Sequence, residues 1–188
     1  MRIVAGSAKG RVLAAPKSDD VIRPTADRVR ETIFNVLGQR CDGLTVLDLF
    51  AGTGALGLEA VSRGALKAVL VDREKEALEL CRLNTDTFKF ADRVEIIAGS
   101  AIQTVGMLGK KGRVFELVFS DPPYALTAGV SVLEALAEAK IVSNEGVAVI
   151  EHGKNERLPE RVGDFVQIDE RDFGTAIVTI FRLTVQDA

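Results

Sequence analysis

Short apolar runs alternate with segments of helical periodicity along most of the chain. From residue 44 onward, five apolar runs predict buried strands, and the first four are each followed by a segment whose apolar residues recur at helical spacing. The predicted strands cover 44–50, 67–72, 93–98, 115–120 and 145–151, and the predicted helices cover 55–63, 74–87, 100–108 and 128–139. Such alternation is typical of an α/β domain with a doubly wound parallel sheet.

Two further β-type runs, 165–171 and 175–183, end this pattern. Only residues 172–174 separate them, which is too short for a crossover helix, so the two runs are expected to pair antiparallel. The sequence therefore predicts a seven-stranded sheet whose last strand pair is antiparallel. A complete dinucleotide-binding domain would instead continue with a helix and a sixth parallel strand.

The amino-terminal part of the chain does not belong to the alternation of strands and helices. Two β-prone runs, 2–6 and 10–14, predict a β-hairpin, which needs a supporting surface because two strands alone are marginally stable in water. After a polar linker, an amphipathic helix is expected from Thr25 to Gln39. We therefore expect a hairpin and linker over residues 1–23 and a main domain over residues 24–188.

The composition is that of a single domain, but its charged residues are distributed unevenly along the chain. Of the 188 residues, 47% are hydrophobic, and the net charge is −3, so the chain can bury a sizeable core and is not uniformly basic. Residues 1–40 nevertheless carry a net charge of +4, and residues 1–17 contain four Lys or Arg and no acid. This basic front favours contact with nucleic acid, although a short charged run is also common on a solvated surface.

Several kinds of site are not expected. Cys41, Cys81 and the single histidine, His152, lack the spacing of zinc ligands, so no metal is predicted. His152 at a strand end is more typical of packing or hydrogen bonding than of a general base. Asn84 is expected on a helix surface. No apolar run reaches the length of a membrane helix and no secretory leader is evident, so a cytoplasmic protein is expected.

A glycine-rich loop follows the first predicted strand. Gly52, Gly54 and Gly57 lie where strand changes to helix, and glycine is favoured where the backbone takes unusual dihedral angles or approaches a ligand. The spacing also fits the dinucleotide fingerprint, with Asp72 as the acid after the next strand. Asp48, however, lies inside the strand before the glycines, which is not part of that fingerprint.

The other candidate residues also lie at strand ends. Ser100 and Ala101 follow the third predicted strand, and Asp121-Pro122-Pro123-Tyr124 follows the fourth. The carboxyl ends of parallel strands share one edge of the sheet, so these residues are expected around one crevice. Two consecutive prolines fix two φ angles and hold the Pro122 carbonyl in one direction.

Together, these motifs resemble those of S-adenosylmethionine-dependent methyltransferases. The Asp-x-Phe-x-Gly-x-Gly loop resembles their first motif, and the seven-stranded sheet resembles that of their class I, a Rossmann-like fold. Asp-Pro-Pro-Tyr resembles the motif of enzymes that methylate exocyclic amines of nucleobases. The resemblance implies binding of S-adenosylmethionine by Thr25, Asp48, Phe50, Ala51, Gly52, Gly54, Asp72, Arg73, Ser100 and Ala101. It implies catalysis by Asp121, Pro122 and Tyr124.

The chemistry explains these residue types. An amine on a purine ring is a poor nucleophile because its lone pair is delocalised into the ring. Hydrogen bonds from the amine to the Asp121 carboxylate and the Pro122 carbonyl would bias the nitrogen toward a tetrahedral shape, and Tyr124 would stack on the exposed base. Methylation of cytosine C5 would need a cysteine nucleophile in this loop, which the loop lacks.

The amino-terminal residues resemble one particular family among these methyltransferases. Met-Arg-Ile-Val-Ala-Gly at residues 1–6 and the Arg-Pro-Thr block at residues 23–25 resemble the ribosomal RNA small subunit methyltransferase D type, which methylates guanine N2. The resemblance implies ribosomal RNA as the partner, within a small subunit or an assembly intermediate, and contacts to RNA from Arg2, Lys9, Arg11, Arg23 and Arg28.

Three alternatives remain open. The first is an adenine-N6 methyltransferase acting on DNA or RNA, because the Asp-Pro-Pro-Tyr motif indicates that the target is an exocyclic amine but does not identify the base. The second is a non-catalytic RNA-binding or assembly factor on a methyltransferase fold. The third is an NAD oxidoreductase.

Overall fold

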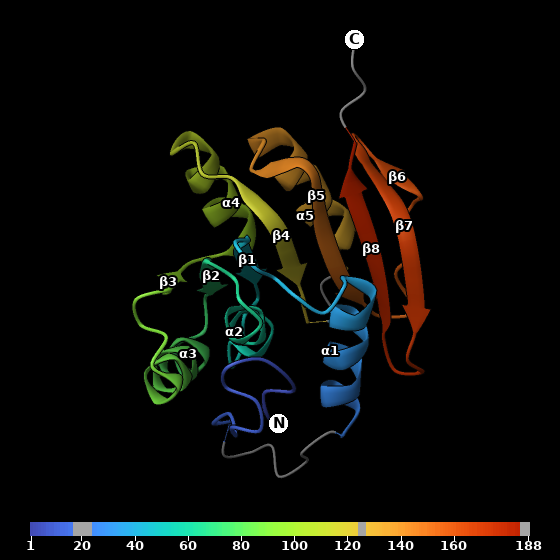
Figure 1. The fold of residues 1–188 in the computed structure, drawn as a ribbon. Coiled ribbons are helices and arrows are strands. Elements are labelled where there is room, and N and C mark those ends of the chain that lie inside the picture. Colours follow the sequence, from blue (N-terminus) through green and yellow to red (C-terminus); the bar gives the residue numbers. More distant parts are fainter. Residues whose placement is uncertain (17–23, 124–126, 185–188) are drawn as a thin grey trace.

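The computed structural model describes residues 1–16, 24–123 and 127–184. A single sheet forms the middle layer, and helices cover both of its faces (Figure 1). The helices are α1 (Pro24–Val36), α2 (Ala55–Ser62), α3 (Lys75–Phe88), α4 (Ala101–Lys110) and α5 (Gly129–Ala139). The strands are β1 (Thr45–Leu49), β2 (Lys67–Asp72), β3 (Val94–Ala98), β4 (Phe115–Ser120), β5 (Val142–His152), β6 (Arg161–Val162), β7 (Phe165–Asp172) and β8 (Ile177–Leu183).

The strand order explains where a ligand can bind. The order is β3-β2-β1-β4-β5-β8-β7-β6, with β1 to β5 parallel and β8 antiparallel to both β5 and β7. The chain moves outward from β1 to β3 and then returns to place β4 on the other side of β1. In sheets of this kind, ligands bind at the carboxyl ends of the strands on either side of such a reversal, which here are β1 and β4. The doubly wound sheet and its antiparallel end are confirmed.

Two features of the fold differ from the sequence prediction, namely the number of strands and the end of the first helix. The sheet has eight strands because the two-residue β6 pairs with β7. Helix α1 ends at Val36, three residues before Gln39, because the chain turns into the left-handed region at Gly38 (φ 86°) and Gln39 (φ 67°). The Gln39 amide then donates to the Phe34 carbonyl at 2.7 Å, which closes the helix end.

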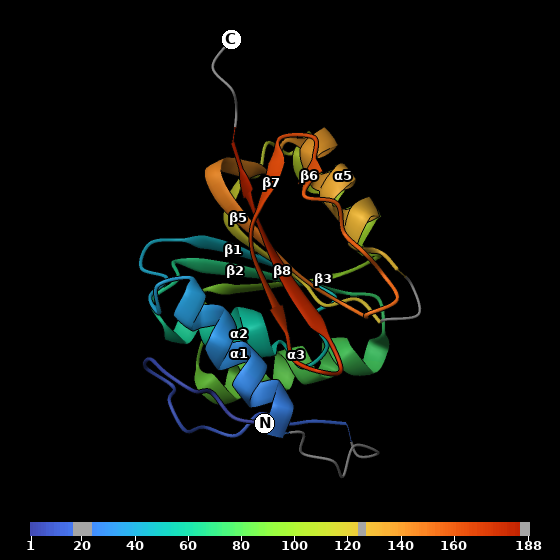
Figure 2. The ribbon, with the colours of Figure 1, turned by 90° about the vertical axis from the view of Figure 1, so that its right-hand side faces the viewer.

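Two hydrophobic clusters pack on opposite faces of the sheet. The first contains side chains of α1, α2 and α3 together with Ile3, Ala8 and Leu13 from the amino-terminal segment, which we define as residues 1–16. The second contains side chains of α4 and α5. Figure 2 shows α1, α2 and α3 on the side of the sheet where the amino-terminal segment also lies, with α5 beyond the strands. The amino-terminal segment is therefore part of the core on the first face.

The expected amino-terminal hairpin is present but irregular: it contains one antiparallel bridge, between Arg2 and Val12, and its two runs are joined by backbone hydrogen bonds from Ile3 to Arg11, from Gly10 to Ile3 and from Leu13 to Met1. Regular pairing is interrupted because the backbone amides of Val4 and Ala5 donate instead to the carboxylate of Glu59 on α2, at 2.8 and 2.9 Å. Gly6 (φ 80°) passes so close to α2 that an added Cβ would lie 1.8 Å from the Ser62 carbonyl oxygen. The segment is thus fitted closely to α2.

Candidate cofactor and base-binding site

The glycine loop is tied to two carboxylates. The Gly52 amide donates to Asp72 Oδ2 at 2.9 Å, and the Gly57 amide donates to Asp48 Oδ2 at 2.8 Å. Gly54, at φ 79°, lies in the left-handed region immediately before α2, where a side chain would be strained. The loop is therefore held open at the end of β1 by the two acids that the sequence singled out.

Asp48 is a buried support of the loop. Its side chain lies in the core of the sheet, and burial raises its pKa to about 7, with Asp72 adding a smaller repulsive contribution and the Gly57 amide opposing it. A carboxyl in this position exchanges its proton near neutral pH. It contacts loop backbone rather than lining the pocket described next.

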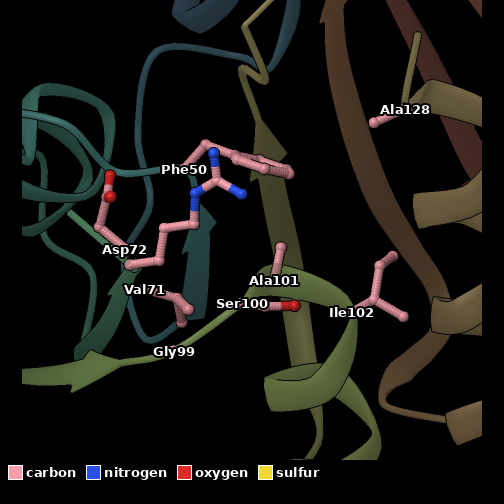
Figure 3. Close-up of a pocket in the computed structure, with 9 residues that line it drawn as sticks. Phe50, Val71, Asp72, Gly99, Ser100, Ala101, Ile102 and Ala128 are labelled. Atoms are coloured by element: carbon pink, nitrogen blue, oxygen red, sulfur yellow. The ribbon is translucent and has the colours of Figure 1, made fainter. Parts of the chain in front are cut away.

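A pocket of about 240 Å³ opens beside the loop (Figure 3). The residues that line it come from four segments: Phe50, Val71, Asp72, Arg73, Gly99, Ser100, Ala101, Ile102 and Ala128. Phe50 has φ 60°, which is unusual for a residue with a side chain. Strained backbone of this kind clusters at functional sites, and here it occurs where Phe50 lines the pocket.

The pocket fits the adenosine part of S-adenosylmethionine. Asp72 offers carboxylate acceptors for neighbouring ribose hydroxyls, and Phe50, Ala101 and Ile102 provide apolar surface for a flat base. The volume is below the roughly 300–1,000 Å³ of sites that enclose a whole drug-sized ligand. The pocket alone is therefore too small to enclose the whole cofactor.

Asp121 lies next to this loop at the end of β4. Its amide makes a 3.4 Å hydrogen bond to the Leu49 carbonyl at the end of β1, which joins the two strand ends. The residue keeps surface open to solvent, whereas Pro122 is buried. Desolvation by the surrounding protein, followed by repulsion from Glu151 and Asp48, raises the pKa of Asp121 well above its usual range.

The structure brings together most of the predicted cofactor residues. Phe50, Asp72, Arg73, Ser100 and Ala101 line the pocket, while Asp48, Ala51, Gly52 and Gly54 belong to the adjoining strand and loop. Arg2, Lys9, Arg11 and Arg28 are exposed. Arg23, Tyr124 and the side chain of Thr25 lie outside the described residues. Which of these residues bind ligands stays a prediction.

The family of the chain follows from its sequence as a whole. The family described as "Conserved hypothetical protein 95" matches residues 1–182. The chain belongs to this family. A Bacillus subtilis relative, provisionally named as the rRNA methyltransferase YlbH, is 36% identical over 182 residues, which cover 97% of this chain and 98% of the relative. The ribosomal RNA small subunit methyltransferase D of Escherichia coli strain K12 is 35% identical over 159 residues, which cover 85% of this chain and 78% of the relative.

Solved structures agree with this family assignment. An Escherichia coli structure, provisionally named as the methyltransferase yhhF, superposes with a TM-score of 0.86 at 31% identity and covers 99% of both chains. The fold of this family member is thus the class I methyltransferase fold, and the resemblance to the small subunit methyltransferase D type is confirmed. A Rossmann-type NAD enzyme is not supported by the antiparallel β8, which lies beside β5 where that fold has a sixth parallel strand, or by these relatives.

Several residues that support the glycine loop were not predicted from the sequence. The thiol of Cys81, whose pKa is raised by burial to about 12, donates to the Gly52 carbonyl at 3.3 Å. Asn84 is buried rather than on the helix surface: its amide donates to the Thr53 carbonyl at 2.9 Å and accepts from the Ala14 amide at 2.7 Å. Helical periodicity alone could not reveal that the amino-terminal segment covers this face of α3.

Other candidate features have structural roles or carry no site. His152 is buried, with Nε2 2.9 Å from Thr179 Oγ1, which agrees with the expected packing and hydrogen-bonding role. Across residues 1–16, 24–123 and 127–184, no cluster of His, Cys, Asp and Glu is arranged to hold a metal ion. No helix in the same ranges is long and apolar enough to cross a membrane.

Proposed function

We propose that the chain transfers a methyl group from S-adenosylmethionine to the exocyclic N2 amine of a guanine in small-subunit ribosomal RNA. The observation that carries this proposal is the position of Asp121 and Pro122, at the strand end next to the glycine loop and the pocket lined by Asp72. The names of the relatives from Bacillus subtilis and Escherichia coli support RNA as the substrate class.

The cofactor is held at the carboxyl ends of β1, β2 and β3. In this proposal Asp72 binds the ribose, Phe50 and Ala101 enclose the adenine, and the open backbone at Gly52 and Gly54 lets the methionine part approach. Bound S-adenosylmethionine supplies an electrophilic methyl group on a positively charged sulfur. The other steps depend on how the protein holds the target amine.

Asp121 and the Pro122 carbonyl position that amine. Each accepts a hydrogen bond from one of the two N–H groups of the amine, and these bonds turn the nitrogen lone pair toward the methyl carbon. With the cofactor bound, the nitrogen–carbon bond would form as the carbon–sulfur bond breaks, and the electron pair of that bond would stay on sulfur. The proton that the nitrogen loses leaves along its hydrogen bond to Asp121, whose raised pKa makes it a suitable acceptor. Catalysis rests on positioning and on stabilisation of the developing positive charge.

The amino-terminal segment supplies the proposed RNA contact. Arg2, Lys9 and Arg11 are exposed on it, and Arg28 is exposed on α1, while the apolar side chains of both elements pack on the first face of the sheet. Phosphate groups of RNA are natural partners for such exposed cations. Ribosomal RNA in a small subunit or an assembly intermediate is the substrate that we expect to bind there.

Methyl transfer to separate substrates tests this function. Radiolabelled S-adenosylmethionine is offered with protein-free small-subunit rRNA, with assembled small subunits and with duplex DNA, and the labelled nucleosides are then identified. We expect N2-methylguanosine from an RNA sample and no label in DNA. Labelled N6-methyladenine would establish the adenine alternative, and the absence of transfer to all three substrates would favour a non-catalytic RNA-binding factor.

A further inference from the structure

Glu151 lies beside Asp121 at the end of the neighbouring strand. The register of β4 and β5 pairs Phe119 with Val149 and Ser120 with Ile150, so Asp121 and Glu151 are the next residues on the two strands. Neighbouring parallel strands are about 4.8 Å apart. The two carboxyl groups therefore start from adjacent positions at the edge where the proposed target base enters.

Both side chains belong to the same face of the sheet. Phe119 and Val149 pack in the first hydrophobic cluster, and side chains two residues apart on a strand share a face. Asp121 and Glu151 each lie two residues further along, so both belong to the first face. Glu151 is half-buried, and it is the charged residue that most strongly repels the Asp121 carboxylate. The mechanism proposed above gives Glu151 no role.

We propose that Glu151 selects guanine by accepting a hydrogen bond from the N1–H group of the base while Asp121 and the Pro122 carbonyl hold its N2 amine. This inference rests on the function proposed above. Guanine carries N1–H directly beside its N2 amine, so its two neighbouring donor groups match two neighbouring carboxylates. Adenine has an unprotonated N1 beside its amine, and that lone pair would face the Glu151 carboxylate.

This role would also account for two acids lying next to each other despite their repulsion. Either group alone could accept from an amine, and one carboxylate with one carbonyl would serve adenine as well as guanine. An unprotonated ring nitrogen and a carboxylate oxygen are both acceptors, so they repel each other and cannot share a hydrogen bond, and a base with an unprotonated N1 fits this position less well than guanine. Glu151 would therefore supply the base specificity that the Asp-Pro-Pro-Tyr motif lacks.

An analogue of the target base tests this role. 2-Aminopurine keeps the amine at position 2 but has an unprotonated N1. Small subunits are reconstituted with guanine or 2-aminopurine at the nucleotide that the wild-type protein methylates, and single-turnover rates are compared for the wild type, Glu151→Gln and Glu151→Asp. The difference in intrinsic reactivity between the two amines is the same for every variant, so it cancels when the ratio of the two rates is compared between variants.

We expect the wild type to methylate 2-aminopurine about 10²-fold more slowly than guanine, the upper end of what one unmade hydrogen bond costs. Glu151→Gln should bring the two rates within about tenfold, because the carboxamide can donate a hydrogen bond to the unprotonated N1. Glu151→Asp, which keeps a carboxylate, should preserve the preference for guanine even if turnover is slower. Glu138→Gln, at an exposed position on α5, is the control and should leave both rates unchanged.

The possible failures can be told apart. If the wild type methylates guanine but Glu151→Gln leaves the ratio of the two rates unchanged within about twofold, the role of Glu151 is wrong and the proposed function stands. If the wild type methylates no guanine, the proposed function fails and the inference fails with it. Affinity for S-adenosylmethionine, measured for each variant, shows whether the sheet and the cofactor pocket are intact.

Discussion

At the scale of single residues, acidic groups dominate the region around the site. Asp48 pairs in register with Phe119, two residues before Asp121, and Glu151 lies beside Asp121 on β5. Desolvation and repulsion from neighbouring carboxylates both disfavour the ionised forms, so the pKa values of Asp48 and Asp121 are raised above those of ordinary carboxyl groups. Two expectations follow for the dependence of activity and stability on pH.

The rate of methyl transfer should fall with acidification at an unusually high pH. Asp121 must be ionised to accept from the amine, and its pKa is raised, so the rate should decline as pH falls through that raised value rather than near 3.8. Glu151→Gln removes a repelling charge and should move the decline to lower pH. Single-turnover rates at saturating cofactor across a pH series measure this. A decline centred near 4 in the wild type would contradict the assignment.

Asp48 should make the protein less stable as pH rises from about 4 to 7. In this range the folded state holds the Asp48 proton and the unfolded state has lost it, so the free energy of unfolding decreases with rising pH. Asp48→Asn cannot ionise and should lack this contribution. Denaturant titrations at pH 5 and pH 8 should show a smaller decrease for the variant than for the wild type. Equal decreases would show that Asp48 does not titrate in this range.

At the scale of elements, the amino-terminal segment is attached to the domain by a buried charge. The carboxylate of Glu59 on α2 is fully buried, and it accepts from the Val4 and Ala5 amides and from the guanidinium groups of Arg30, at 3.3 Å, and Arg63, at 2.8 Å. One side chain thus joins the segment, α1 and α2. Truncation of the segment would uncover this network and part of the core, so charge substitution is the cleaner test of RNA binding.

Substitution of Glu59 should be strongly destabilising. Glu59→Gln removes the carboxylate that pairs with the buried Arg63 and one of the two carboxylates that pair with the buried Arg30, which keeps its ion pair with Asp27. Breaking a buried ion pair in this way costs about 3–5 kcal/mol of unfolding free energy. Glu74→Gln removes a partner from an exposed pair with Arg73 and should cost no more than about 1 kcal/mol. Denaturant unfolding of the two variants makes the comparison. Similar losses for both would contradict the anchoring role of Glu59.

Substitution of the basic side chains should weaken RNA binding without weakening the fold. Arg2, Lys9 and Arg11 are exposed, so replacing all three by Ala should leave cofactor affinity intact and reduce the salt slope of rRNA binding by about 0.7 for each lost phosphate contact. Replacing the exposed Lys67, Lys110 and Lys111 by Ala removes the same charge elsewhere. If both triple variants bind rRNA alike across a salt titration, the RNA surface lies elsewhere.

Helices and strands could be predicted from the sequence where the spacing of apolar residues follows which side chains are buried. Strands such as β1 and β2 read as continuous apolar runs because helices cover both faces, and the short connection before β8 fixed its antiparallel direction. The positions of Asp72 and Asp121 followed from the same reasoning, since both end parallel strands. The buried settings of Glu59 and Asn84 did not, because each depends on a segment more than 50 residues away.

At the scale of the whole molecule, the sheet separates two tasks. The pocket at the ends of β1, β2 and β3 fits the cofactor, and the edge formed by β4 and β5 presents Asp121 and Glu151 on the face that also carries α1 and the amino-terminal segment. The two regions meet where β1 and β4 lie side by side, at the reversal of strand order. In the proposed function, a methyl group bound on one side of this junction is transferred to an amine held on the other.

The most direct measurement compares turnover and cofactor affinity in Asp121→Ala and Asp72→Ala. Single-turnover methyl transfer to small-subunit rRNA should fall by about 10²–10³ in Asp121→Ala, with the Kd for S-adenosylmethionine unchanged within about twofold, because this carboxylate faces the amine. Asp72→Ala should instead weaken cofactor binding, and Asp86→Ala, an exposed acid on α3, should change neither quantity. If Asp121→Ala retains most of the wild-type rate, or loses cofactor affinity as Asp72→Ala does, Asp121 does not position the target amine.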